Sequence, residues 1–228
     1  MRFQTSLNGT AHGPTHQRST ITAHDSQKVP IVSESTYRLA VIVGSTRDGR
    51  FGPTVAKWFT EQAARHGGME IDLIDLALHP LPVRITKEPT AEEAAALAEV
   101  TPRLERADAF VVLTPEYNHS YPASLKNLID WHYTQWRAKP VAFVSYGGLA
   151  GGLRAVEHLR PVFTELHAAP IREQVSFHSP WGKFDADGRH LDPEAGEQAA
   201  GAAKVMLDQL SWWALSLREA RAARPYGA

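Results

Sequence analysis

The chain has 228 residues and a mass of 25.1 kDa, which is the size of one ordinary domain. Its 24 lysines and arginines nearly balance 25 aspartates and glutamates, so it offers no basic bulk for a nucleic-acid backbone. The absence of cysteine excludes disulfides, thiolate nucleophiles and cysteine-bound metals, and any redox chemistry therefore needs a bound cofactor. No apolar run approaches the roughly 18 residues of a membrane span, so we expect no membrane as a partner. The balanced charge likewise leads us to expect no nucleic acid as a partner.

Residues 1–36 are rich in polar side chains and show no hydrophobic periodicity, so we expect a flexible N-terminal tail. The basic start at Arg2 is not followed by the apolar core of a secretory signal, which favours a cytoplasmic location. The histidines of this tail, His12, His16 and His24, lack the spacing of a metal site, and we expect no metal.

From residue 39 onward, short apolar runs alternate with turns and helical stretches, which is the pattern of β-α-β units. Residues 39–43, 109–113 and 141–144 are apolar throughout, as central parallel strands covered on both faces are. Residues 71–76 form another expected strand, and residues 171–178 alternate apolar with polar side chains, which indicates an edge strand. The prediction is an α/β three-layer sandwich with a parallel sheet of order 2-1-3-4-5 and helices on both faces.

The expected helices carry start and stop signals. Pro53 suits the first turn of one helix, Thr90 and Glu93 form a capping box for the next, and Pro161 should kink or interrupt a later one.

A last helix begins near Pro193, and its apolar stripe must be covered by its own domain or by a partner subunit. The stripe comprises Val205, Leu210, Trp213 and Leu217. The expected division is a tail over 1–36, a domain over 37–178 and a C-terminal extension over 179–228.

In a sheet of this order, ligands bind outside the carboxyl ends of strands 1, 3 and 4. The segments that follow those strands are residues 44–52 (the first loop), 115–122 (the second loop) and 145–152 (the third loop). We therefore expect these loops to converge on one site.

The first loop joins small and hydroxyl residues to a cation at a helix N-terminus, a combination that holds a phosphate dianion. The residues concerned are Ser45, Thr46 and Arg47. Arg50 and Phe51 stand where a triphosphate-binding loop needs Lys and Ser or Thr, and the dinucleotide Gly-x-Gly-x-x-Gly pattern is missing. The first loop therefore favours a mononucleotide.

The glycines of the third loop leave its backbone free of side-chain bulk, so a flat ring can lie against it, or the loop simply makes two tight turns. Tyr117 and Tyr146 either cover such a ring or pack loop against loop.

Taken together, residues 44–47, 115–118, 121–130 and 145–152 resemble the NAD(P)H-dependent FMN reductases of flavodoxin-like fold, over about residues 38–177. The resemblance implies that FMN is the cofactor and that NADPH or NADH is the cosubstrate. It implies that the first-loop residues named above hold the phosphate. It also implies cofactor-binding roles in the second and third loops for Pro115, Glu116, Tyr117, Asn118, Ser145, Tyr146, Gly147, Gly148 and Gly151.

The resemblance also implies a small-molecule electron acceptor, such as free flavin, a quinone, an azo dye, a nitroaromatic compound or a metal oxyanion, and a homodimer or homotetramer. The acceptor and the choice between NADH and NADPH stay open, although Arg84 and Lys87 could meet a 2′-phosphate. Two alternatives stay open as well, a flavodoxin-like electron carrier and an interaction module without cofactor.

We expect no catalytic side chain, because hydride transfer to a flavin ring needs none. Glu116 is either an acid or base or a loop-orienting carboxylate, and His119 either donates to substrate or lies on the surface. Lys126 and Asp130 have the spacing of a helix-face ion pair.

Overall fold

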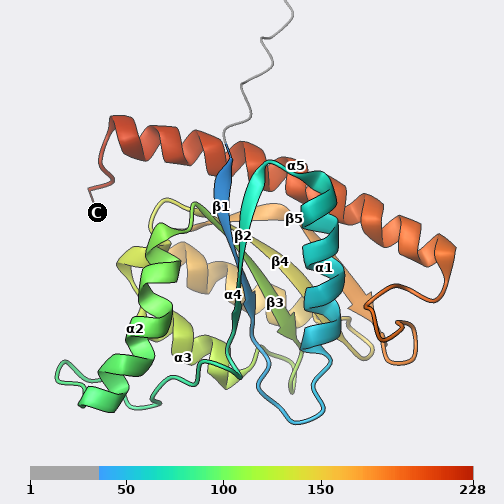
Figure 1. Ribbon diagram of the computed structural model, residues 1–228, viewed down its shortest axis with the longest axis horizontal. Helices are drawn as coiled ribbons and strands as arrows, with labels where there is room; N and C mark the ends of the chain where they lie inside the picture. Colours follow the sequence, from blue (N-terminus) through green and yellow to red (C-terminus); the bar gives the residue numbers. More distant parts are fainter. Residues whose placement is uncertain (1–35, 228) are drawn as a thin grey trace, which may run out of the picture. The chain divides into compact units, whose positions relative to one another are not determined.

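The computed structural model describes residues 36–227 and contains a five-stranded parallel sheet of order β2-β1-β3-β4-β5 (Figure 1). The strands are β1 (Tyr37–Val43), β2 (Met69–Asp75), β3 (Ala109–Pro115), β4 (Pro140–Gly147) and β5 (Ala169–His178). The predicted order and the predicted edge position of the last strand are confirmed. The tail predicted over residues 1–36 lies outside the described residues, apart from its last residue.

Two helical layers cover the sheet because alternate side chains of each strand point to opposite faces. The helices are α1 (Gly52–His66), α2 (Ala91–Arg106), α3 (Ala123–Trp131), α4 (Leu153–Glu165) and α5 (Pro193–Ala223), with the short 3-10 helix η1 (Thr134–Trp136) after α3. In β1, Leu39 and Val41 join the core under α1 and α5, whereas Ala40 and Ile42 join the core under α2, α3 and α4. The predicted three-layer sandwich is thereby confirmed.

The register brings the carboxyl ends of the strands to one edge of the sheet. Val43 at the end of β1 pairs with Asp75 and Leu113, and Thr114 in β3 pairs with Ser145 in β4. The loops that follow these strands therefore begin side by side, at the lower edge of Figure 1.

The helix signals are largely confirmed. Thr90 accepts from the Glu93 backbone N–H at 3.2 Å while the Glu93 carboxylate accepts from the Thr90 N–H at 2.8 Å, a complete capping box. Pro161 does not interrupt its helix, since α4 runs continuously through it. The ion pair between Lys126 and Asp130 is present at 2.7 Å.

The apolar stripe predicted for α5 was right at Leu210 and wrong at Val205 and Trp213. The buried residues of this helix are Ala203, Met206, Leu207, Leu210 and Ala214, which pack on the sheet and on α1. Val205, five residues before Leu210, is 54% exposed, and Trp213 is 37% exposed although it stands three residues after Leu210, because the buried line continues through Ala214 instead. The covering that α5 requires thus comes from its own chain. The domain division at residues 36 and 178 stays a prediction.

Within residues 36–227, no helix is both long and apolar enough to cross a membrane. The same residues contain no group of three or more acidic, histidine or cysteine side chains arranged to hold a metal ion.

Candidate functional site at the carboxyl ends of the strands

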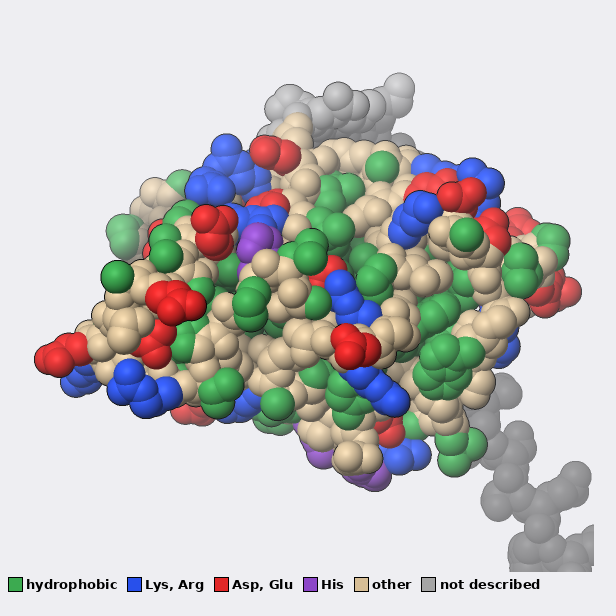
Figure 2. Space-filling model, turned by 60° about the horizontal axis from the view of Figure 1, so that its bottom comes forward, with side chains coloured by type: hydrophobic (Ala, Val, Ile, Leu, Met, Phe, Trp, Pro, Cys, Tyr) green, Lys and Arg blue, Asp and Glu red, His purple; other side chains and the backbone are tan. Residues whose placement is uncertain are grey.

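The three predicted loops meet around a cavity of about 360 Å³, called here the site cavity. It is lined by Arg47, Asp48, Gly49, Arg50, Phe51, Pro115, Glu116, Tyr117, Tyr146, Gly147 and Trp181. Figure 2 turns this edge of the sheet toward the viewer, where basic and acidic side chains lie next to one another among hydrophobic ones. The loops after β1, β3 and β4 each contribute to the lining.

An ion pair between Arg50 and Asp75 fixes the first loop to the end of β2. The guanidinium donates from Nη1 to Oδ1 at 2.5 Å, from Nη2 to Oδ2 at 2.7 Å, and from Nη1 to the Ser45 carbonyl at 2.9 Å. Its hydrogen bond to Asp75 raises the pKa of Arg50 above the ordinary value, so the guanidinium stays charged. In the sequence Arg50 stands out only as a mismatch to a triphosphate loop, and nothing there indicates its positioning role.

The first loop presents unused hydrogen-bond donors. Within residues 36–227, the backbone N–H groups of residues 46–49 donate to no protein acceptor, and the exposed Arg47 has no ion-pair partner. Helix α1 begins directly after this loop with no side-chain cap, so its positive end is also available. Backbone N–H groups, a helix terminus and a guanidinium together suit an anion such as a phosphate.

Two residues predicted to hold the phosphate have side chains that lie elsewhere. Ser45 is fully buried, and its Oγ accepts from the Tyr146 hydroxyl at 3.1 Å. Burial raises the pKa of Tyr146, so this phenol stays protonated as the donor. A Cβ at Gly52 would lie 2.6 Å from Ser45 Oγ, so the helix can begin this close only with glycine. Thr46 lines a neighbouring apolar cavity instead.

The second loop contributes a buried carboxylate. Oε1 of Glu116 lies 3.2 Å from Arg154 of α4, whereas Oε2 is buried and has no hydrogen-bond partner among residues 36–227. The side chain is 11% exposed and lines the site cavity. An unpaired buried carboxylate oxygen is costly, so Glu116 would gain from an N–H or O–H donor that reaches Oε2.

The second loop then makes a tight turn. The backbones of Tyr117 and Ser120 exchange hydrogen bonds of 2.8 and 3.1 Å. Asn118 and His119 occupy the tip with φ of 48° and 73°. Asn118 is therefore exposed at the tip and does not line the cavity, while His119 contacts Arg154 at 3.0 Å.

The third loop brings only part of its predicted set to the cavity. Tyr146 and Gly147 line it, but Ser145 is buried and donates to the Gly151 carbonyl at 2.9 Å. A Cβ at Gly151 would lie 2.5 Å from Ser176 Oγ, so this glycine serves the packing of the loop on β5. Gly148 has nothing within 4 Å of such a Cβ and lies outside the lining.

Trp181 lines the site cavity and was missed in the sequence. It follows the carboxyl end of β5, the strand next to β4. This position in the chain is the signal from which its place at the site could have been predicted.

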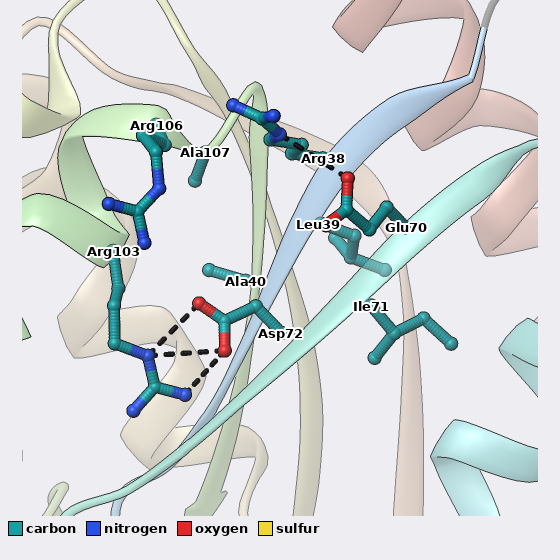
Figure 3. Close-up of a pocket in the computed structure, with 9 residues that line it drawn as sticks. All are labelled: Arg38, Leu39, Ala40, Glu70, Ile71, Asp72, Arg103, Arg106 and Ala107. Atoms are coloured by element: carbon teal, nitrogen blue, oxygen red, sulfur yellow. Dashed lines mark hydrogen bonds and ion pairs between the residues drawn. The ribbon is translucent and has the colours of Figure 1, made fainter.

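A second cavity, at the amino end of the sheet, is a poor alternative (Figure 3). It lies between β1, β2 and the end of α2, at the edge opposite the three loops. Arg103 donates to Asp72 from Nε at 3.0 Å, and Arg38 pairs with Glu70 at 3.3 Å. These charges largely neutralise one another, so the arrangement ties α2 to β2.

Residues 37–182 match the sequence model of the family described as NADPH-dependent FMN reductase. An NAD(P)H-dependent FMN reductase of Schizosaccharomyces pombe is 38% identical over 127 residues, which cover 51% of this chain and 61% of that protein. A probable NADPH:quinone oxidoreductase of Oryza sativa subsp. japonica is 33% identical, over 82% of this chain and 93% of that protein. The structure of FerB, a flavoenzyme NAD(P)H:(acceptor) oxidoreductase from Paracoccus denitrificans, matches with a TM-score of 0.62 at 25% identity, over 79% of this chain and 98% of that chain. The chain therefore has a flavodoxin-like fold and belongs to the NADPH-dependent FMN reductase family of FMN-dependent oxidoreductases.

Proposed function

We propose that the protein holds FMN in the site cavity and uses NADPH or NADH to reduce a small flat acceptor of the quinone class. The observation that carries the proposal is the first loop, where backbone N–H groups and Arg47, all without a partner in the described part of the chain, border a cavity next to the start of α1. This loop lies within the residues that match the family.

The residues present fit FMN. Arg47 and the N–H groups of residues 46–49 would hold its phosphate. Glu116 Oε2, buried without a partner, offers an acceptor to an N–H or O–H of the same ligand. Gly147 lines the cavity with its backbone, and a Cβ there would lie 3.0 Å from the Gly152 nitrogen, so this glycine lets the third loop pack closely beside the proposed ring site. Bound FMN would supply hydride acceptance and onward electron transfer, which no side chain here provides.

The rest of the chain positions these groups. Arg50 pins the first loop to Asp75, and the Tyr146–Ser45 hydrogen bond holds that loop against the end of β4. Arg154 pairs with Oε1 of Glu116 and leaves Oε2 without a partner among the described residues. Rigid donors of this kind need no reorganisation when a ligand binds, which favours affinity.

One site cavity is proposed to serve both the nicotinamide and the acceptor, so the two take turns. An acceptor that shares a confined space with a ring must itself be thin, which favours quinones and other planar aromatic compounds. The rice relative, named as a probable NADPH:quinone oxidoreductase, supports the quinone class.

Steady-state assays with NADPH and NADH against benzoquinone, an azo dye, free FMN and chromate test this function. We expect quinone reduction to be the fastest reaction, and it should require FMN. An electron carrier would bind FMN without oxidising either nicotinamide. An interaction module would bind no flavin, and either result would refute the proposal.

We also propose that the protein is a homodimer or homotetramer. The support is a set of exposed apolar side chains in the segment between β2 and α2, where Leu78, Val83 and Ile85 are 73%, 88% and 53% exposed. Light scattering of the wild type and of Val83→Ser tests this, and a monomeric wild type would refute it. The cytoplasmic location expected from the sequence likewise stays a proposal.

A further inference from the structure

Trp181 presents a large apolar side chain to solvent at the site cavity. Its indole is 59% exposed, although it lines the cavity together with Phe51 and Gly147. Among the described residues it has no aromatic partner, and its N–H donates to no acceptor. Tryptophan is costly to leave half in water, so its place at a cavity needs an explanation.

The backbone that carries Trp181 is firmly held. The Ser179 N–H donates to the Gly147 carbonyl at 2.7 Å, which joins this segment to the third loop. The Lys183 N–H donates to the Pro180 carbonyl at 3.0 Å, and Gly182 has a φ of 75°. These features define a β-turn with Trp181 at its first corner.

The segment after the turn is anchored in the core. Phe184 packs edge-on against Phe51 at 5.7 Å and against Phe177 at 5.3 Å between ring centroids. Lys57 of α1 also holds this segment, through an ion pair of 2.9 Å to Asp187. The exposed indole therefore projects from a fixed base, so its exposure does not come from a loosely held segment.

We propose that Trp181 contacts the flavin and covers it in the site cavity. This inference rests on the proposed function, because it takes the flat isoalloxazine ring of FMN as the occupant. An electron-rich indole and an electron-poor planar ring attract one another when they meet face to face, and both lose water-exposed apolar surface. The ring would thus bury the part of Trp181 that the protein leaves exposed.

Fluorine NMR on the full chain labelled with 5-fluorotryptophan tests the contact. Trp181→Phe assigns one of the six tryptophan resonances. Trp212 is the matched control, because it is 62% exposed and does not line the cavity. We expect added FMN to move the Trp181 resonance and to remove its H₂O/D₂O isotope shift, while the Trp212 resonance keeps both.

Flavin titration of variants gives the second measurement. Trp181→Ala should weaken FMN binding about three- to tenfold, the size of an aromatic contact, while Trp181→Phe and Trp212→Ala should stay near the wild type. If FMN binds and the Trp181 resonance keeps its position and isotope shift, the contact is refuted and the proposed function stands. If FMN does not bind at all, the titration is flat and both proposals fall.

Discussion

Replacing Arg50 by Met tests whether an ion pair outside the ligand's own contacts builds the first loop. The change removes both hydrogen bonds to Asp75 and the bond to the Ser45 carbonyl. Of its partners among the described residues, the Asp75 side chain then keeps the Ala77 N–H alone, at 3.1 Å, although it is just 14% exposed. Breaking a mostly buried pair in this way should cost about 3 kcal/mol of unfolding free energy.

The same change should weaken FMN binding about tenfold. Without the ion pair, binding of FMN must itself order the first loop, and fixing the backbone of one residue costs roughly 1 kcal/mol. Urea unfolding of the apoprotein and flavin titration measure the two effects. Arg103→Met is the matched control, since it breaks a comparable pair with Asp72 on the same strand but at the amino end. It should lower stability and leave FMN affinity unchanged. Wild-type affinity in Arg50→Met would refute this role.

Three further predictions concern the third loop, pH dependence and the reaction. Gly151→Ala should lose about 1 to 3 kcal/mol of stability, because its φ is 60° and a Cβ would strike Ser176, whereas Gly148→Ala, in open space, should be nearly neutral by thermal unfolding. Burial lowers the pKa of Lys139 to about 8, so the unfolded chain binds more protons above that pH. This effect should raise the unfolding free energy, measured with urea, by about 2 kcal/mol between about pH 6 and about pH 9.5. The same rise of unfolding free energy with pH in Lys139→Met would contradict it. Glu116→Gln should keep turnover within about threefold, with parallel double-reciprocal lines, and lost turnover with FMN still bound would show that the carboxylate carries a proton.

The fold followed from the sequence where local signals and the global arrangement agree. Continuous apolar runs marked β1, β3 and β4 because both of their faces are buried, and the alternating pattern marked β5 as an edge. The capping box fixed the start of α2. The phase of α5 was harder to predict, because apolar residues such as Val205 and Trp212 surround the helix and only packing selects its buried line.

The site was predictable as a set of loops but not as a set of side chains. Which way Ser45 and Thr46 point depends on backbone angles that residue types do not specify, and one is buried while the other turns to a different cavity. The partner of Arg50 lies 25 positions away and becomes visible only once β1 and β2 are placed side by side. Trp181 required the fifth strand end to be counted as part of the same edge.

Equilibrium titration of the purified apoprotein with FMN, alongside Arg47→Ala and Arg65→Ala, tests the central claim most directly. Arg65 stands at the opposite end of α1, 67% exposed, and pairs with Glu61, so it controls for the loss of an arginine. We predict about one equivalent of FMN in the wild type and in Arg65→Ala, with FAD bound more weakly. Arg47→Ala should lose about 1.5 to 3 kcal/mol of binding free energy, the range for a hydrogen bond to a charged group. No flavin bound, or equal affinity in Arg47→Ala, would contradict a phosphate held by the first loop.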